Sequence, residues 1–484
     1  MIDLNKKGYS VSYWPDEKDI YERMDTLVNG PVYQIRREAL KDYLGYFEAK
    51  CAGSKAMVAE AKQYIPGGVQ HNLAFNTPWP LATTKAEGAY VYDVDGNKYV
   101  DYLQAGGPTL LGSNYAPVRE KAIEVINECS PCTGLFHEYE MKLAKEINKN
   151  MPWVEQFRSL ASGTESDMLA IRIARTYTEK KKIIKVGGAY HGWSDQLVFG
   201  LHIPYSGAFE AHGIPSGANA DTQEFFPNDL AGLRKLLEAN VAEGGTAAVI
   251  VEPFGPESGT RPVTQDFNAS VRALCDEFGS LLIFDEVVTG FRIGPGGAAG
   301  FFDIVPDLVV FGKIVAGGYP AAGGVGGSKE VMSVVAAGVD TSKHHAYCGG
   351  TLSANPLSCA AGYYAIKEIV EQDAAVKAGQ NADKLTAGIN ELIKKYGLPF
   401  VAWNTGSIVH FEVAGMMYID IRDPDFFKKM VAQRTAVEEF GAGLTANGVI
   451  TLAGSRIYTS MADDDETIDI TLKAFDDVLG NIEK

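Results

Sequence analysis

Residues 281–318 read LLIFDEVVTGFRIGPGGAAGFFDIVPDLVVFGKIVAGG, and this stretch decides the predicted fold. It contains two short apolar runs, 281–284 and 308–311, and loop-forming sequence follows each of them. Short apolar runs of this kind are typical of buried parallel strands. Asp285 directly follows the first run, and Lys313 lies just beyond the second. Because ligands bind beyond the carboxyl ends of parallel strands, we expect both side chains to reach one crevice.

An acid that must stay ionised and a lysine that must lose its charge suggest a cofactor that needs both. Pyridoxal phosphate (PLP) is such a cofactor, because a lysine forms a Schiff base with it and a carboxylate pairs with its pyridine nitrogen. Each residue alone has an ordinary explanation. An aspartate at a strand end often caps a helix, and a single lysine is usually solvated. The PLP hypothesis therefore depends on the other motifs.

The composition is that of a globular protein with more than one domain. The chain has 484 residues, 46% of them hydrophobic and 22% charged, which is too long for one ordinary core. A net charge of −17 argues against binding to nucleic acid or to anionic membranes. The first residues lack the apolar segment of a signal peptide, and no run reaches the ~18 apolar residues of a membrane span. With only six cysteines, the chain fits the cytoplasm.

No metal site is expected. Cys129 and Cys132 form a single CxxC motif, but a zinc site needs two more ligands and no second pair has zinc spacing. His344 and His345 also lack further ligands at metal spacing. We interpret the CxxC motif as incidental, with a redox role as the less favoured alternative.

The sequence pattern divides the chain into four segments. Residues 1–64 form a helical N-terminal extension, and residues 65–105 contain a β-hairpin with its tight turn at Asp95-Gly96. We expect the second segment to pack with the small domain. Residues 106–375 form the large PLP-binding domain, and residues 376–484 form a smaller α+β domain.

A loop of small residues opens a predicted helix at Ser162-Gly163-Thr164. The free N–H groups and the dipole of a helix N-terminus attract anions such as phosphate, and hydroxyl groups add donors. The simpler explanation of this motif alone is that Ser162 or Thr164 caps the helix. The motif is neither a Walker loop nor GxGxxG, which argues against a nucleotide.

Two further predicted strands end in candidate site residues. The strand at 182–186 leads into Tyr190, whose ring can lie flat on a heteroaromatic ring or simply belong to the core. The strand at 247–251 ends at Glu252, which lies where the sheet meets the crevice. A structural acid bonded to the backbone or to an arginine is an equal alternative for Glu252.

Six motifs follow one another along the chain: SGTES, GAYHG, VEP, IFDEVVTGFR, PDLVVFGKIVAGG and GGTLSANP. Together they resemble the class III aminotransferase family of fold type I PLP enzymes over residues 65–484. The spacing of Asp285 and Lys313 is one that this family uses. GKIVAGG…GGVGG and YVYDVDGNKYVDY are most similar to the glutamate-1-semialdehyde aminomutase branch. The resemblance implies an α/β large domain with a mainly parallel seven-stranded sheet flanked by helices, plus a smaller α+β domain.

The resemblance also implies roles for individual residues. Lys313 would form the Schiff base and later move a proton, while Asp285 would keep the pyridine nitrogen protonated. Tyr190 and Val287 would cover the two faces of the ring. Thr351 would reach the phosphate of the neighbouring subunit's cofactor, so a homodimer with active sites at the subunit interface is expected. The full set of expected cofactor contacts is Ser162, Gly163, Thr164, Tyr190, His191, Glu252, Asp285, Val287, Lys313 and Thr351.

Two positions depart from the aminomutase branch. That branch has an arginine for the substrate carboxylate shortly after its GGV turn, whereas GGVQHNLAF here offers His71 and Asn72 but no arginine. Glu257 stands where the branch has an asparagine near the phenolic oxygen, and a carboxylate there can meet a substrate amine. Arg456 and Arg292 are candidate carboxylate binders or ordinary ion-pair residues. The candidate substrate ligands are therefore His71, Asn72, Glu257 and Arg456.

The first functional hypothesis is an aminotransferase, which moves an amino group from an amino acid or amine donor to a keto acid or aldehyde acceptor by a ping-pong mechanism. The alternative is a PLP-dependent isomerase, either a glutamate-1-semialdehyde-type aminomutase or an amino acid racemase, which uses the same fold and cofactor residues. A third hypothesis is a non-catalytic protein with this fold. The intact Lys313 and Asp285 argue against the third.

Overall fold

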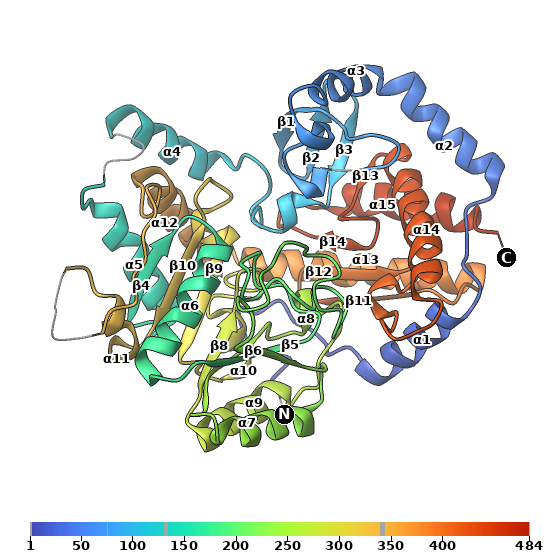
Figure 1. Ribbon diagram of the computed structural model, residues 1–484. Coiled ribbons are helices and arrows are strands. Elements are labelled where there is room, and N and C mark those ends of the chain that lie inside the picture. Colours follow the sequence, from blue (N-terminus) through green and yellow to red (C-terminus); the bar gives the residue numbers. More distant parts are fainter. Residues whose placement is uncertain (1, 75, 130–133, 339–343, 484) are drawn as a thin grey trace. The chain divides into compact units, whose positions relative to one another are not determined.

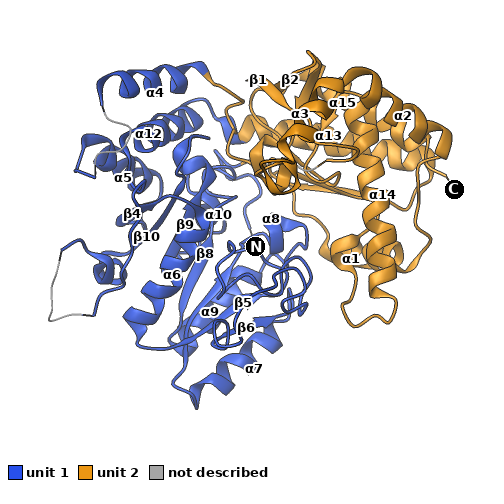
Figure 2. Ribbon diagram, turned by 45° about the horizontal axis from the view of Figure 1, so that its top comes forward, with its two compact units in different colours: residues 1–9, 116–375 blue, residues 10–115, 376–484 orange. Residues whose placement is uncertain are grey.

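The computed structural model describes residues 2–483 except 75, 130–133 and 339–343, so Cys132 of the CxxC motif lies outside the described residues (Figure 1). The chain divides into two compact units (Figure 2). Unit 1 contains residues 1–9 and 116–375, and unit 2 contains residues 10–115 and 376–484. The four-segment division stays a prediction. Among the described helices, none combines the length and the apolar character that crossing a membrane requires.

Unit 1 is built on a seven-stranded sheet with the strand order β4-β10-β9-β8-β7-β5-β6. The strands are β4 (Gln156–Leu160), β5 (Lys182–Val186), β6 (Thr222–Phe225), β7 (Thr246–Val251), β8 (Leu281–Asp285), β9 (Leu308–Gly312) and β10 (Gly323–Gly327). Strands β5 to β9 pair in parallel, and β10 runs antiparallel to both β9 and β4. The prediction of a mainly parallel seven-stranded sheet is confirmed.

The central strands are buried along their whole length, which explains their apolar sequences. Every residue of β7, β8 and β9 is buried, because helices cover a parallel sheet on its faces. The helices of this unit include α4 (Ala116–Glu128), α5 (Glu138–Asn150), α6 (Gly163–Thr178), α7 (Leu230–Val241), α9 (Phe267–Phe278) and α12 (Pro356–Glu371). Helix α6 packs on β7, β9 and β10, and α9 packs on β7 and β8. Asp285 pairs in register with Val310, so the ends of β8 and β9 lie side by side.

The glycine-dense stretch 323–327 is approached closely by neighbouring groups. The stretch is β10, which lies between β9 and β4. A Cβ atom at Gly324 would lie 2.3 Å from the ring of Phe157, and one at Gly326 would lie 2.3 Å from Val154. The glycines therefore let neighbouring side chains fill the space over the strand.

Unit 2 contains two small sheets, with strand orders β1-β2-β3-β13 and β11-β12-β14. The strands are β1 (Thr83–Glu87), β2 (Tyr90–Asp93), β3 (Lys98–Asp101), β11 (Val401–Thr405), β12 (Ile408–Glu412), β13 (Val449–Ile450) and β14 (Arg456–Tyr458). Strands β2 and β3 form the predicted hairpin. Gly96 has a φ of +85°, and the Asp93 side chain accepts hydrogen bonds from the N–H groups of Asp95 and Asn97. Local turn chemistry therefore sets the register of this hairpin.

Segments from both ends of the chain build the core of unit 2. Its helices are α1 (Glu17–Asn29), α2 (Arg37–Lys50), α3 (Ala52–Ala61), α13 (Ala374–Tyr396, shared at its start with unit 1), α14 (Phe426–Ala446) and α15 (Asp465–Gly480). Met24 from α1 lies in the same buried cluster as Phe411, Phe440 and Phe475. Strand β13 also pairs in parallel with β3 through Val449 and Val100. The N-terminal helices are thus part of this core.

Candidate active site

The N-terminus of α6 has the features of an anion site at its expected place. Ser162 has extended backbone angles, and its hydroxyl accepts a hydrogen bond from the Glu165 N–H at 3.2 Å, so it caps the helix. Gly163 is the first helical residue. A Cβ atom on Gly163 would lie 3.1 Å from Val287. The Ser162 hydroxyl serves as the helix cap. The N–H groups in the first turn of a helix lack partners within the helix, so they can donate hydrogen bonds to an anion.

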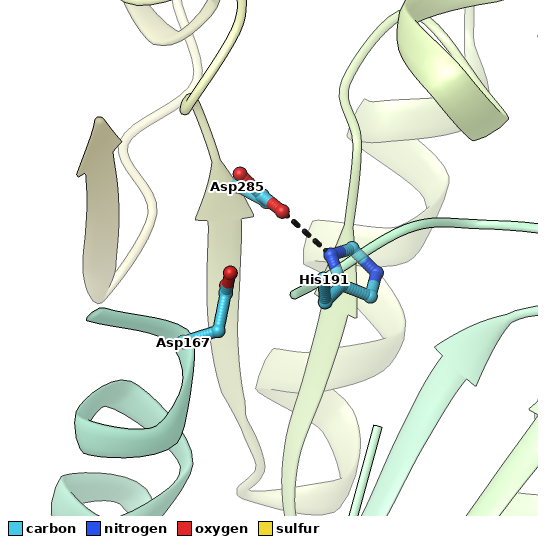
Figure 3. A group of neighbouring side chains, drawn as sticks. All are labelled: Asp167, His191 and Asp285. Carbon is cyan, nitrogen blue, oxygen red and sulfur yellow. Dashed lines mark hydrogen bonds and ion pairs between the residues drawn. The ribbon is translucent and has the colours of Figure 1, made fainter. Parts of the chain in front are cut away.

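Asp285, at the end of β8, and His191, in the loop after β5, form a buried pair (Figure 3). His191 Nδ1 lies 2.7 Å from Asp285 Oδ2, and both side chains are almost completely buried. Burial lowers the pKa of His191, although the hydrogen bond to Asp285 opposes this shift. A neutral His191 therefore donates its Nδ1–H to the carboxylate, and the Val287 N–H donates to Oδ1 at 3.0 Å. These two donors hold the Asp285 carboxyl group in one orientation.

Glu252 holds together the segments that surround this pair. Its carboxylate accepts hydrogen bonds from the backbone N–H groups of Tyr190 (3.1 Å), Glu257 (2.7 Å) and Ser258 (2.5 Å). Burial raises the pKa of Glu252 to about 8, with further contributions from Asp285 and Glu257, while the backbone hydrogen bonds lower it. Glu257 and Ser258 have φ values of +49° and +53°. Glu252 therefore fixes a strained turn and the backbone of Tyr190.

The loop after β5 packs against the start of α6. Gly192 has a φ of +75°, and a Cβ atom there would lie 2.6 Å from Thr164. A hydrogen bond with Thr164 lowers the pKa of Tyr190, but burial outweighs it and raises that pKa. Tyr190 nevertheless keeps 43% of its surface exposed. An aromatic face is thus available beside the proposed phosphate site.

Lys313 follows β9 directly and starts a short 3-10 helix, η4 (Lys313–Ala316). Its φ of +47° is left-handed, which is unfavourable for a residue with a side chain and often marks functional sites. A Cβ atom on Gly312 would lie 2.8 Å from Val287. Because Val287 also packs against Gly163, it connects the start of α6 with the segment that carries Lys313.

Glu257 is the one candidate substrate ligand of unit 1. Its carboxylate lies 2.6 Å from His202 Nε2, and His202 Nδ1 lies 2.9 Å from Glu210. Burial lowers the pKa of His202, but the two carboxylates outweigh burial and raise the pKa to about 10. His202 is therefore a cation bonded to two acids.

The other predicted residues are distributed over both units. Thr351 is exposed and lies in unit 1 just before α12. His71, Asn72 and Arg456 belong to unit 2. Arg292, the other candidate carboxylate binder, is completely buried. The roles of all five residues stay predictions.

Two buried charged residues of the site were missed by sequence reasoning. Lys185, in the middle of β5, donates hydrogen bonds to the carbonyl groups of Ala189, Leu197 and Phe199 at 3.2, 3.0 and 2.6 Å. Burial lowers its pKa to about 8. Asp167, on the first turns of α6, faces Asp285 (Figure 3). The available signal was a charged residue inside an apolar strand or on the buried face of a helix.

The residues of this site fit PLP. The cluster supplies a helix N-terminus for a phosphate, a buried carboxyl group for a pyridine nitrogen, an aromatic face and a lysine at a strand end. Two buried polar atoms, His191 Nε2 and Asp167 Oδ1, have no hydrogen-bond partner within the described part of the chain. A mainly parallel seven-stranded sheet that carries such a site defines a PLP-dependent enzyme of the aminotransferase fold.

Comparison with known proteins identifies the family. The class III aminotransferase model matches residues 74–479, so the chain belongs to this family of PLP-dependent enzymes. The glutamate-1-semialdehyde 2,1-aminomutase 1 of Lachnoclostridium phytofermentans is 39% identical over 361 residues, which cover 73% of this chain and 82% of the relative. The aminomutase of Chlorobium limicola is 35% identical over 422 residues, covering 86% and 95%. A solved transaminase with PLP bound has a TM-score of 0.78 at 24% identity and covers 89% of this chain and 97% of that one.

Proposed function

We propose that the protein is a PLP-dependent isomerase of the aminomutase type, which moves an amino group between carbon atoms of one small molecule. The observation that carries this proposal is the 39% identity to a glutamate-1-semialdehyde 2,1-aminomutase over 73% of the chain. The motifs alone placed an aminotransferase first and an isomerase second. The relatives favour the isomerase, and we reverse that order.

The positions of the site residues support a separate role for each of them. Lys313 would hold the cofactor covalently and would move the substrate proton, and its position at the end of β9 places the amine at the carboxyl edge of the sheet. Asp285 would pair with the pyridine nitrogen, and the N–H groups of His191 and Val287 hold its carboxyl group in place. When bound, PLP withdraws electrons from the substrate carbon that carries the amino group. Gly163 and Thr164 bind the phosphate through the helix N-terminus.

Glu257 is the proposed contact for a substrate amine. His202 holds the Glu257 carboxylate in place, and the strained turn at Glu257 is fixed by Glu252. A carboxylate in this position favours a substrate with a positively charged amino group. His71, Asn72 and Arg456 remain proposed substrate ligands, since Arg456 offers a charge for a substrate carboxylate.

The decisive experiment supplies glutamate 1-semialdehyde as the only substrate and follows its NMR spectrum. An aminomutase forms a rearranged isomer of the same composition, releases no keto acid and needs no second substrate. The Lys313→Ala variant should bind PLP without a covalent bond and lose turnover, whereas Lys181→Ala, at an exposed lysine, should behave like the native protein. An absolute requirement for a keto acid or aldehyde acceptor would contradict the proposal.

The second candidate is an aminotransferase, and one sequence feature favours it. The chain contains no arginine between residues 38 and 118, so the arginine that the aminomutase branch places after its GGV turn is missing. A donor amine alone would then give one equivalent of keto product, and turnover would continue only after an acceptor is added. NMR spectra recorded without and then with an added acceptor therefore separate the two functions.

We also propose that the enzyme works as a homodimer. Leu135, Phe136 and Tyr347 of unit 1 expose 76%, 77% and 79% of their surfaces. Exposed large apolar side chains of this kind commonly mark a surface that another chain covers. Thr351, close to Tyr347 in the sequence, is the residue proposed to reach the neighbouring subunit's cofactor.

A further inference from the structure

Asp167 is a buried acid to which the proposed mechanism gives no role. It lies on the first turns of α6 with only 1% of its surface exposed. One carboxylate oxygen of Asp167, one of Asp285 and one ring nitrogen of His191 all lie within 4.8 Å of one another. Figure 3 shows the Asp167 carboxyl group pointing toward the Asp285–His191 pair. Two carboxyl groups therefore share one dry wall of the cofactor site.

Two carboxylates so close together in a buried site do not both ionise, because each disfavours the charge on the other and water is not there to screen them. Asp285 has two donors for its charge, the His191 Nδ1–H and the Val287 N–H. Asp167 Oδ1, by contrast, has no hydrogen-bond partner among the described residues. The proton of the pair is therefore more stable on Asp167.

We propose that Asp167 and Asp285 hold one proton between them and that Asp167 carries it, which makes Asp167 a positioning residue that limits this wall of the site to one negative charge. The location of the proton is argued from the two acids alone, and only its effect on the cofactor rests on the proposed function. That effect is that one negative charge on this side of the site matches the one positive charge of a protonated pyridine ring. A second negative charge would lack a partner in the site.

The charged groups around Asp167 support this assignment. Burial raises the pKa of Asp167 well above its usual range, the charges of Asp285 and Glu252 raise it further, and Lys313 opposes them. His191 does not supply a compensating charge, because burial lowers its pKa. The acids from β7 and β8 thus outweigh the single lysine after β9.

The first test is the pH dependence of thermal unfolding of the holoenzyme, with native protein compared to Asp167→Asn. A raised pKa means that the folded chain binds more protons than the unfolded chain above pH ~4, so the native protein loses stability as pH rises. Asparagine keeps the shape and removes the titration. We expect the melting temperature of Asp167→Asn to exceed that of the native protein, with a gap that widens as pH rises from about 5.5 to 8.

Two further variants separate the pH dependence of the melting temperature from the effect of altered packing. Asp167→Ala leaves a space and should melt at a lower temperature than Asp167→Asn, but its difference from the native protein should change with pH in the same direction. Asp469→Asn removes an exposed aspartate of α15 and should leave a gap that does not depend on pH between those limits. Parallel pH curves for the native protein and Asp167→Asn would overturn the proposal.

The second test reads the proton and the cofactor directly. The infrared difference spectrum between the native holoenzyme and Asp167→Asn should contain the C=O band of a protonated carboxyl group, because the bands of the other buried carboxyl groups, such as Glu252, cancel in the difference. The visible absorbance of bound PLP should change little in Asp167→Asn and clearly in Asp285→Asn. If the difference spectrum contains the bands of an ionised carboxylate in place of this C=O band, Asp167 is ionised and the proposal is wrong.

The same three side chains could instead bind a metal ion, and this alternative has its own outcome. A divalent cation such as Zn²⁺ or Mn²⁺ would then raise the melting temperature of the native protein but not that of Asp167→Asn. A protonated Asp167 is a poor ligand, so we expect equal effects of the cation on both proteins. None of these readouts measures turnover, so they hold whether the enzyme is an isomerase or a transaminase.

Discussion

Lys185 shows how one buried side chain can organise an active-site loop. Its ammonium group is completely buried in β5 and donates to three carbonyl groups at 189, 197 and 199. The segment between these carbonyls carries Tyr190 and His191, two of the proposed cofactor contacts. The lysine therefore ties the end of β5 to the loop that follows, at the expense of burying a charge.

The charge on Lys185 should give stability a measurable pH dependence. Its pKa is lowered to about 8 in the folded protein and is about 10.4 in an unfolded chain, so between these values the unfolded chain binds more protons. Stability should therefore rise with pH across this window, by roughly 2–3 kcal/mol relative to Lys185→Met. Urea unfolding at several pH values measures the difference.

Lys181→Met is the matched control for this prediction, because Lys181 precedes the same strand but is exposed. It should show no such change relative to the native protein. If Lys185→Met and the native protein have equal slopes between about pH 8 and 10, the lysine is not held in a buried, neutralisable state.

Glycines at the ends of strands and helices decide how closely these elements of the site approach one another. Val287 fills the space beside both Gly312 at the end of β9 and Gly163 at the start of α6. The three residues come from segments far apart in the sequence, yet they bring the proposed phosphate site, the ring site and Lys313 together. A side chain at either glycine would separate them.

Gly312→Ala should weaken cofactor binding. The added Cβ would lie 2.8 Å from Val287, so the end of β9 or Val287 must shift. We expect a loss of PLP affinity of about tenfold or more, because small displacements at such sites have large effects. Fluorescence titration of the apoprotein with PLP measures it. Gly217→Ala, with no atom within 4 Å of its Cβ, should bind PLP normally, and normal binding by Gly312→Ala would contradict the packing argument.

Much of the element structure could be predicted because its signals are local. The apolar runs of β8 and β9 and the turn at Gly96 were assigned from composition and turn chemistry. Strand β10 was not predicted, because four of its five residues are glycines, which carry no hydrophobic pattern.

The positions of two candidate site residues follow from the same local signals, although their roles stay predictions. Asp285 and Lys313 were placed at the ends of two predicted strands, and these strands, β8 and β9, do pair in parallel as neighbours. Asp167 and Lys185 could not, because their importance depends on burial beside residues that are distant in the sequence. The only local signal for Asp167 and Lys185 was a charged residue within an otherwise apolar pattern.

At the scale of the whole molecule, the proposed homodimer makes a sharp prediction for mixed subunits. Lys313→Ala inactivates its own subunit's site, and Thr351→Val should weaken the partner's site. A mixture of the two variants, exchanged into hybrid dimers, should recover about a quarter of native activity, because half of the dimers are hybrids and each has one intact site. Activity after mixing, together with sedimentation of the native protein, measures this.

Separate variants measured without mixing are the control for complementation, as is a mixture of Lys313→Ala with the double variant Lys313→Ala/Thr351→Val, which contains no intact Lys313. Neither should gain activity. If mixing Lys313→Ala with Thr351→Val restores nothing although subunits exchange, Thr351 does not act across an interface.

Unit 2 has one further consequence, for the order in which the chain becomes structured during synthesis. Residues 10–115 leave the ribosome first, but the helices and the strand β13 that complete their core come from residues 376–484. The apolar surfaces of α1 and α2 are therefore not yet covered by residues 376–484 while residues 116–375 of unit 1 are translated. Nascent chains of this enzyme should accordingly depend on chaperones that bind exposed apolar segments until residues 376–484 have emerged.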